Sequence, residues 1–499
     1  MAWTESGLVR GTTANGAEQF LGVPYAAPPI DDLRWRAPAR VPRWRGIRDA
    51  KTLPNACAQL PSTNGPGSTA EDCLYLSLYR PASFHAFWKR RLPVLIWIHG
   101  GSLLNGSGSQ QDASEMAVST DTIVVMINYR LNVFGFLALP SLSAEAPDGS
   151  SGNLGLLDQQ ASMAWVQRNI AAFGGDPRNV TIAGESAGGG SVCFHLASPT
   201  AKGLFDRAVI QSGAFDLTLL HQGVGGPCGT ITLAQAEQAG RSFAASVGCS
   251  DSATEAACMR SKSAEELLAA SASFTAEVNT SGAALPVPVL AAIQSGTWNQ
   301  VPVILGSNHD ELQPTAALTP GLGYPLDPLI YSIAVDVLFG GDAPQVLAEY
   351  PAANYADPAF ALGALLTDNA FACPTDKLRH LLSTLTPTYG YEFDDPNAPP
   401  GVQSGMPSGA YHSADVQYLF DYTPSHGVLS PDQKALSLEM IRYWAAFADQ
   451  GRPEVQAAPI WPRFDELSHG VLSLRPVAST AIDDFADFHH CDFWNSLHP

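Results

Sequence analysis

The segment Gly184-Glu-Ser-Ala-Gly188 places a serine where it could act as a nucleophile. The segment follows a run of strand-forming residues at 180–183 and precedes a small-residue stretch at 187–196 that predicts a helix. In this G-x-S-x-G arrangement the glycines allow a sharp turn, and the serine hydroxyl is exposed at the carboxyl end of the strand. Backbone N–H groups at the start of the helix then face developing negative charge. The motif therefore predicts a nucleophilic role for Ser186.

A serine nucleophile needs a base and an acid that orients this base, and the chain order here would be serine, acid, histidine. Asp310 and Glu311 directly follow a predicted strand at 301–305, and His412 lies in a loop after a predicted strand at 388–393. An acid at the carboxyl end of a sheet strand is well placed to meet a loop histidine. Spacing alone does not choose between the two carboxylates, nor between His412 and the other histidines.

A second set of donors is expected at the end of the predicted strand 93–98. There the chain reads His99-Gly-Gly-Ser102. A glycine-rich loop at this point can direct backbone N–H groups at an acyl oxyanion. The alternative is a glycine turn of the hairpin type without a catalytic role.

The elements that must position these residues alternate between strand and helix. Buried runs at 93–99, 122–128, 180–183, 207–211, 301–305 and 388–393 predict strands, and 155–173 predicts a helix. This alternation predicts an α/β fold with a large, mostly parallel central sheet and helices on both faces. Segments at about 220–285 and 320–385 are helical in pattern. Since strands resume after each, we expect helical cap insertions in a single catalytic domain spanning 1–499.

Composition excludes several classes of protein. The chain has 499 residues, of which 45% are hydrophobic and 15% charged, which excludes a disordered chain. Its net charge of −20 makes nucleic acid and anionic membranes poor partners. No apolar run approaches the ~18 residues of a membrane span, so no membrane insertion is expected.

No dinucleotide-binding glycine motif follows a strand, so no cofactor is expected. The run His489-His490-Cys491 lacks a spaced second half, so no metal site is expected either.

Eight cysteines are too sparse for a disulfide scaffold. Cys57 and Cys73 flank a Pro/Gly/Ser/Thr-rich loop, and Cys249 and Cys258 flank a short one, so a crosslink would limit the unfolded freedom of each loop. Unrelated buried thiols are the alternative. The spacing suggests no partners for the other four cysteines, which are Cys193, Cys228, Cys373 and Cys491.

The chain resembles the type B carboxylesterases, the carboxylesterase/cholinesterase family of α/β hydrolases. Ordered blocks along nearly the whole length carry the resemblance: Gly22-Val-Pro-Tyr-Ala26, Leu33-Arg-Trp35, Glu71-Asp-Cys-Leu-Tyr-Leu76, Asn128-Tyr-Arg130, Phe134-Gly-Phe136, Gly152-Asn-Leu-Gly-Leu-Leu-Asp-Gln159, and Phe173–Thr181 running into Gly184–Gly189.

The resemblance implies roles that spacing left open. By it the triad is Ser186, His412 and Glu311, and the oxyanion donors are the backbone N–H groups of Gly101, Ser102 and Ala187. It also implies the disulfides Cys57–Cys73 and Cys249–Cys258, and the structural ion pairs Arg34–Glu71 and Arg130–Asp158.

Two departures from the family pattern bear on specificity. Ser102 stands where the family usually has a third glycine, which predicts a smaller or more polar acyl pocket. The loop 58–72 lacks the tryptophan with which cholinesterases bind a quaternary ammonium, so a role specific to acetylcholine is disfavoured.

These observations predict a serine carboxylic-ester hydrolase that forms a covalent acyl-enzyme on small to medium esters. The alternatives are a lipase-like enzyme, a carbamate, lactone or polyester hydrolase, and a non-enzymatic binding relative, which the filled triad positions disfavour.

The expected partner is a small-molecule ester, and the oligomeric state stays open. The paired cysteines favour a secreted or periplasmic chain, although no signal peptide is visible and a cytoplasmic location is left open. Of three glycosylation sequons, only the one at Asn279 lies where a glycan is expected to fit.

Overall fold

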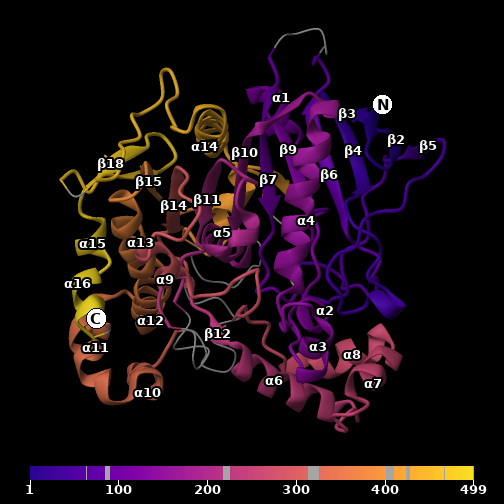
Figure 1. Cartoon of the computed structure of the whole chain (residues 1–499). Coiled ribbons are helices and arrows are strands. Elements are labelled where there is room, and N and C mark those ends of the chain that lie inside the picture. Colours follow the sequence, from indigo (N-terminus) through magenta and orange to yellow (C-terminus); the bar gives the residue numbers. More distant parts are fainter. Residues whose placement is uncertain are drawn as a thin grey trace.

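A large twisted sheet forms the centre of the molecule in the computed structural model (Figure 1). The structure describes residues 1–62, 64–84, 90–216, 225–312, 325–400, 409–422, 427–465 and 467–497. Among these, 11 strands lie side by side in the order β18 (Thr480–Ile482), β17 (Val471–Leu474), β15 (Thr388–Phe393), β14 (Val303–Asn308), β11 (Arg207–Gln211), β10 (Gly175–Glu185), β7 (Leu92–Ile98), β9 (Ile123–Ile127), β6 (Tyr75–Pro81), β4 (Ala17–Pro24) and β3 (Thr12–Ala14).

The strands from β17 to β9 are all parallel, and antiparallel strands lie at both edges of the sheet. The prediction of a mostly parallel sheet is therefore confirmed. Small sheets form from β1 (Ala2–Thr4), β2 (Gly7–Arg10) and β5 (Ile47–Asp49), from β12 (Ile231–Thr232) and β13 (Asn279–Thr280), and from β8 (Gln111–Asp112) and β16 (Asp421–Tyr422).

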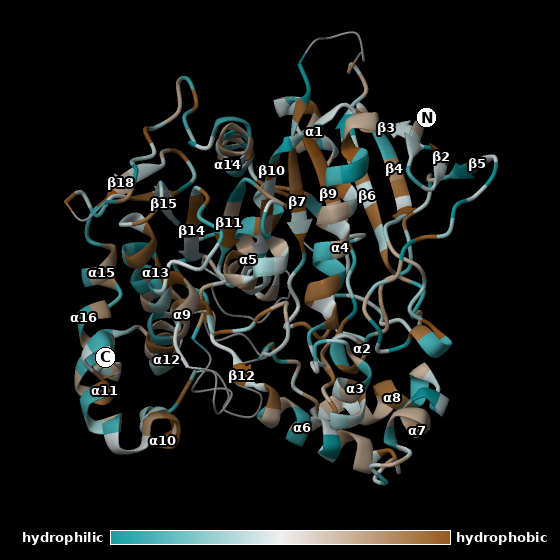
Figure 2. Cartoon of the chain, in the orientation of Figure 1, coloured by the Kyte–Doolittle hydropathy of each residue, from teal (hydrophilic) through white to brown (hydrophobic). Residues whose placement is uncertain are grey.

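The central strands form because their side chains are buried on both faces of the sheet. In β7, Ile96 and Ile98 enter one hydrophobic cluster while Leu95 and Trp97 enter another, as the two-residue period of a strand requires. Figure 2 shows these strands as the most hydrophobic part of the fold. The predicted strands are present with small shifts in their ends. The strand expected at 301–305 runs instead from Val303 to Asn308, which brings its end close to Glu311.

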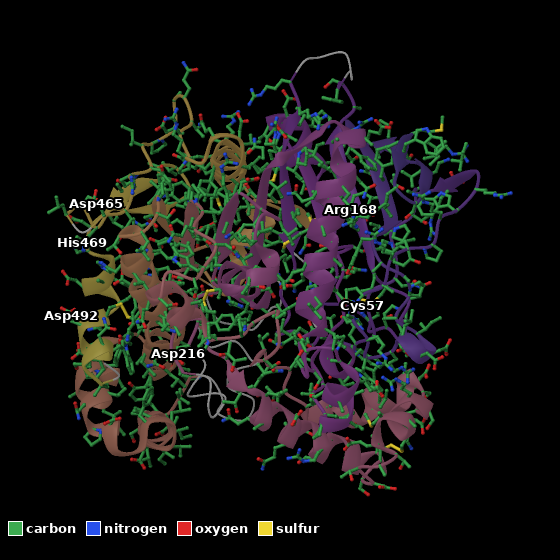
Figure 3. The ribbon with its side chains drawn as sticks, in the orientation of Figure 1. Cys57, Arg168, Asp216, Asp465, His469 and Asp492 are labelled. Atoms are coloured by element: carbon green, nitrogen blue, oxygen red, sulfur yellow. A yellow bond between two sulfur atoms is a disulfide. The ribbon has the colours of Figure 1, made fainter. Side chains whose placement is uncertain are left out.

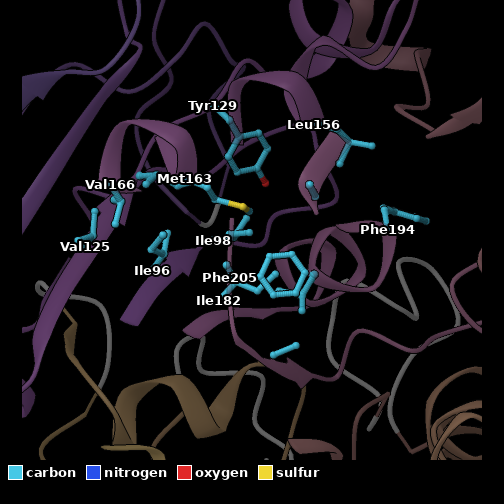
Figure 4. Packing of buried hydrophobic residues seen from close by; sticks show 14 of the residues in the cluster. Ile96, Ile98, Val125, Tyr129, Leu156, Met163, Val166, Ile182, Phe194 and Phe205 are labelled. Atoms are coloured by element: carbon cyan, nitrogen blue, oxygen red, sulfur yellow. The ribbon is translucent and has the colours of Figure 1, made fainter. Parts of the chain in front are cut away.

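Helices cover both faces of this sheet. On one face α4 (Leu154–Asn169) and α5 (Ala187–Ala197) pack against β10, and α13 (Cys373–Ser383) packs against β14 and β15. Figure 4 shows part of this core, in which Met163 and Val166 of α4 lie near Ile96. On the other face lie α1 (Ser114–Thr120) and α14 (Pro431–Gln450).

Other helices lie beyond the carboxyl ends of the central strands, toward the bottom of Figure 1. One group, within the expected insertion at 220–285, consists of α6 (Leu233–Ser246), α7 (Glu255–Ser261) and α8 (Ala264–Ala270). A second, within 320–385, consists of α10 (Pro328–Phe339), α11 (Ala343–Glu349) and α12 (Pro358–Thr367), whereas α13 of the same segment packs on the sheet. Residues 220–224 and 320–324 of these expected insertions lie outside the described residues.

The remaining helices are short. They are α2 (Asn132–Phe136), α3 (Pro140–Glu145), α9 (Val289–Gln294), α15 (Phe485–Phe488) and α16 (Cys491–Leu497). No helix in the described ranges is both long and apolar enough to cross a membrane.

All eight cysteines are paired in four disulfides (Figure 3, which labels Cys57). The two loop disulfides implied by the resemblance, Cys57–Cys73 and Cys249–Cys258, are present. The other bonds are Cys193–Cys228, which spans 35 residues, and Cys373–Cys491, which spans 118 residues. Spacing did not suggest these two bonds, because each joins segments that only the fold brings together.

Two implied ion pairs and one sequon can also be located. Arg34 binds Glu71 at both carboxylate oxygens, and the fully buried Asp158 accepts two hydrogen bonds of 2.7 Å from Arg130. The expectation for Asn279 is wrong. Its side chain is fully buried and donates a 2.9 Å hydrogen bond to a backbone carbonyl, so it cannot carry a glycan in the folded protein.

Candidate active site

Ser186 lies on the sharp turn between β10 and α5. Its backbone has φ 55° and ψ −126°, a conformation that is strained for a residue with a Cβ atom. The turn is held because Gly188 packs directly on β7, where any Cβ atom would collide with the carbonyl oxygen of Ile98. The serine hydroxyl therefore stands at the carboxyl end of the parallel strands, as the motif predicted.

His412 and Glu311 lie next to this hydroxyl. His412 Nε2 is 2.8 Å from Ser186 Oγ, and His412 Nδ1 is 2.6 Å from Glu311 Oε2. Glu311 is 2% exposed, and its second oxygen accepts a 2.8 Å hydrogen bond from the backbone N–H of Asn308 at the end of β14. Both carboxylate oxygens are thus occupied, which fixes the carboxylate toward Nδ1 and leaves Nε2 facing the hydroxyl.

Asp310, the other carboxylate that spacing left open, points elsewhere. Its Oδ2 accepts a 2.9 Å hydrogen bond from the backbone N–H of Ala410, two residues before His412. Its position supports the loop that carries the histidine, and Glu311 is the carboxylate of the pair that reaches the imidazole.

The loop 99–102 follows β7 and lies beside Ser186. Gly101 has φ 101°, and a Cβ atom there would overlap the backbone of Asn105, so this position requires glycine. Among the described residues, no hydrogen bond uses the backbone N–H of Gly101 or Ser102. The N–H of Ala187 begins α5, where the first N–H groups of a helix have no partner within it. All three expected donors are therefore free to bind an anion.

Two buried carboxyl groups beside the imidazole were not predicted from the sequence. Glu185 Oε1 lies 3.4 Å from His412 Nε2, and Asp415 accepts a 2.7 Å hydrogen bond from the side chain of Gln211. The sequence did contain a signal for these two groups. Glu185 directly precedes Ser186 at the end of a strand, and Asp415 lies three residues after His412. Burial raises the pKa of Glu185 to about 8 and that of Asp415 to about 6.

These carboxyl groups affect the pKa of His412. Burial would lower the pKa of His412, but the carboxyl groups of Glu185 and Glu311 outweigh this effect and raise the pKa above its ordinary value. The site therefore stabilises an imidazolium, which is the state that a general base reaches after taking a proton.

A pocket of about 300 Å³ lies against the hydroxyl and the imidazole. Its described lining is predominantly polar and consists of Asn64, Trp97, His99, Gly100, Gly101, Ser102, Asn105, Gln110, Gln111, Glu185, Ser186, His412, Ser413 and Val416. Ser102, the departure from the family pattern, is exposed in this lining and has a positive φ of 56°.

A second cluster of titratable groups lies near the C-terminal helices. Among the described residues, His309, Glu392 and His489 are placed as three metal ligands could be. However, His489 is 2.5 Å from Asp368 through Nδ1 and 2.7 Å from Glu392 through Nε2. The paired carboxylates outweigh burial and raise the pKa of His489 to about 10, so they favour an imidazolium between them. We interpret the cluster as a buried ion-pair network.

Comparisons with known proteins find relatives along nearly the whole chain. A family model described as the carboxylesterase family matches residues 1–323 and 342–494. The pyrethroid hydrolase Ces2e of Rattus norvegicus is 33% identical over 96% of this chain and 87% of its own length. The para-nitrobenzyl esterase of Bacillus subtilis is 32% identical over 94% of each chain. A solved PNB esterase structure is similar with a TM-score of 0.78 and 31% identity over 97% of each chain, which is in accord with the expected α/β-hydrolase fold.

Proposed function

The chain belongs to the carboxylesterase family and is a carboxylic-ester hydrolase, and we propose that it works through Ser186, His412 and Glu311 by way of a covalent acyl-enzyme. The observation that carries this proposal is the continuous line of contacts from Ser186 Oγ through both ring nitrogens of His412 to Glu311, with distances of 2.8 Å and 2.6 Å. The enzyme acts on small-molecule esters, and the pocket of about 300 Å³ supports small to medium ones.

In the first step His412 Nε2 takes the hydroxyl proton while Ser186 Oγ attacks the ester carbonyl. The carbonyl oxygen becomes negative and is bound by the N–H groups of Gly101, Ser102 and Ala187. Glu311 holds the proton on Nδ1 and stabilises the imidazolium. When the tetrahedral intermediate collapses, the imidazolium donates its proton to the leaving alcohol and the acyl group stays on the serine.

In the second step a water molecule takes the place of the alcohol. His412 Nε2 removes one proton from the water, whose oxygen attacks the acyl carbonyl, and the same N–H groups bind the oxyanion. The intermediate then releases the carboxylic acid, and the proton on Nε2 returns to Ser186 Oγ. Proton and charge balance over the two steps, and no group outside the site is needed.

The test is hydrolysis of a short-chain p-nitrophenyl ester by the wild type and by Ser186→Ala. We expect the variant to lose at least about 10³-fold in kcat. Ser242→Ala, on the exposed face of α6, is the matched control and should retain full activity. In the wild type, with an ester whose deacylation is the slower step, rapid mixing should release a burst of one p-nitrophenolate per chain, and mass spectrometry should find the acyl group on Ser186. Full activity in Ser186→Ala would contradict the proposal.

We also propose that the whole chain forms one catalytic domain and that it is secreted or periplasmic. The four disulfides support this location, because such bonds persist in oxidising compartments. Fractionating the native host and assaying Ser186-dependent esterase activity outside and inside the cell tests the location. Limited proteolysis that released a separately folded fragment would contradict the single domain.

A further inference from the structure

Part of the pocket beside the triad borders the imidazole that must protonate the leaving group. In the proposed mechanism His412 Nε2 must donate a proton to the leaving alcohol, so this alcohol must lie next to Nε2. His412, its neighbour Ser413 and Glu185, which is 3.4 Å from Nε2, all line the pocket. We therefore place the alcohol part of the ester in the part of the pocket next to His412, while the oxyanion loop with Ser102 borders the reacting carbonyl.

Side-chain amides give this pocket its chemistry. Asn64, Asn105, Gln110 and Gln111 all line it. Asn64 Nδ2 donates a 2.6 Å hydrogen bond to Asn105 Oδ1, and Gln110 donates to the backbone oxygen of Asn64. The backbone N–H of Asn105 donates to Gly101 in the oxyanion loop. The amides are thus fixed to one another and to the loop that borders the reacting carbonyl.

This arrangement leaves hydrogen-bonding capacity on two residues of the pocket lining. Among the described residues, no hydrogen bond uses Asn64 Oδ1 or Asn105 Nδ2. Exchanging oxygen and nitrogen in both amides would again leave one free acceptor and one free donor, so the result does not depend on that assignment. A free donor beside a free acceptor matches a hydroxyl group, which donates and accepts at once.

Other classes of alcohol fit less well. The described lining contains no lysine or arginine, and the chain carries a net charge of −20, which disfavours an anionic group. Trp97 is 1% exposed and offers no ring face to a quaternary ammonium. Apart from Trp97, Val416 is the one apolar side chain of the described lining, so a long alkyl chain would find little apolar surface to pack against.

We propose that this pocket selects esters of polyhydroxylated alcohols, such as glycerol or a monosaccharide, through Asn64 and Asn105. The inference rests on the proposed function and names the substrate class of that same site.

The test compares two acetates that differ only in hydroxyl groups, 2,3-dihydroxypropyl acetate and propyl acetate, by pH-stat titration. Each rate is divided by that of alkaline hydrolysis of the same ester, which removes intrinsic reactivity. One neutral hydrogen bond corresponds to about a 2- to 12-fold change, so kcat/KM should favour the dihydroxy ester by about tenfold. Asn64→Leu, at an exposed position, and Asn105→Ala should each lower this ratio several-fold.

Controls separate this inference from the proposed mechanism. Gln238→Leu, an amide on the exposed face of α6, should leave the ratio unchanged. Free glycerol should inhibit the wild type more strongly than propan-1-ol, a readout that does not depend on the reactivity of an ester. A ratio near one in the wild type, with Ser186-dependent hydrolysis of both acetates, would overturn the inference and leave the mechanism intact. An equal loss on both esters in Asn64→Leu would overturn it too.

Discussion

Replacing Glu311 with glutamine tests the part of the triad that spacing could not assign. In the structure one carboxylate oxygen accepts from His412 Nδ1 at 2.6 Å and the other accepts from the backbone N–H of Asn308 at 2.8 Å. A glutamine amide has one acceptor oxygen, so it can satisfy only one of the two donors. If the amide oxygen faces Asn308, its NH₂ group faces the imidazole and forces the proton from Nδ1 to Nε2.

That tautomer donates to Ser186 and cannot take its proton. In enzymes with a Ser-His-acid triad, loss of the correct tautomer lowers kcat about 10⁴-fold. If the amide turns over, its NH₂ group instead opposes the N–H of Asn308 and one buried donor is left unpaired, at about 1–3 kcal/mol. We therefore expect Glu311→Gln to lose about 10³- to 10⁴-fold in kcat, or about 4–5.5 kcal/mol at 1.36 kcal/mol per tenfold.

The assay is steady-state hydrolysis of a p-nitrophenyl ester over a range of pH, with circular dichroism to verify folding. Because Glu311 raises the pKa of His412, the residual activity of Glu311→Gln should reach half its maximum at a lower pH than in the wild type. Asp310→Asn is the matched control and should lose less than about tenfold, since Asp310 bonds a loop backbone and not the imidazole. A larger loss in Asp310→Asn than in Glu311→Gln would refute the assignment.

Three more outcomes follow from the structure. The wild-type kcat/KM should increase with pH and reach half its maximum above pH 6.5, because His412 must lose its proton to act as a base and its pKa is raised. A pH–rate profile with a midpoint below 6.5 would contradict this. Replacing both Cys373 and Cys491 with serine should lower Tm by about 5 °C in a thermal melt. The disulfide closes a 118-residue loop, which contributes about 4–5 kcal/mol to the free energy of unfolding. An unchanged Tm would argue against that contribution. Ser102→Gly should raise activity on bulky acyl groups relative to acetate by about threefold or more, measured on a p-nitrophenyl ester series, because it removes a side chain beside the oxyanion loop; an unchanged ratio would exclude that role.

Local signals in the sequence were sufficient for the sheet and for the sharp turn at Ser186. The buried runs at β7, β9 and β11 alternate with helices, and the turn at Ser186 has a fixed sequence between strand and helix. Such features depend on residues close together in the chain, where strand period and turn chemistry act directly.

Features that depend on distant contacts could not be predicted in this way. Cys373 and Cys491 are 118 residues apart and meet only because α16 packs near α13. The choice of Glu311 over Asp310 depends on where β14 ends and which backbone donors each carboxylate meets. The expectation for Asn279 failed for the same reason. A sequon does not show that its asparagine lies in β13 opposite Ile231 of β12, with a buried side chain that donates to the backbone carbonyl of Ser151.

The network around His489 has a consequence for handling the protein in alkaline solution. Its folded pKa of about 10 lies above the ordinary value of 6.5, so its stabilising contribution is complete below pH 6.5, falls steadily above that pH and is lost above about pH 10. The ring joins the C-terminal segment to Asp368 and to Glu392 on β15. In alkaline buffers, which favour a base with a raised pKa, the ring therefore stays protonated in the folded protein while its contribution to stability shrinks, so the protein is better stored at a lower pH than the one used for turnover.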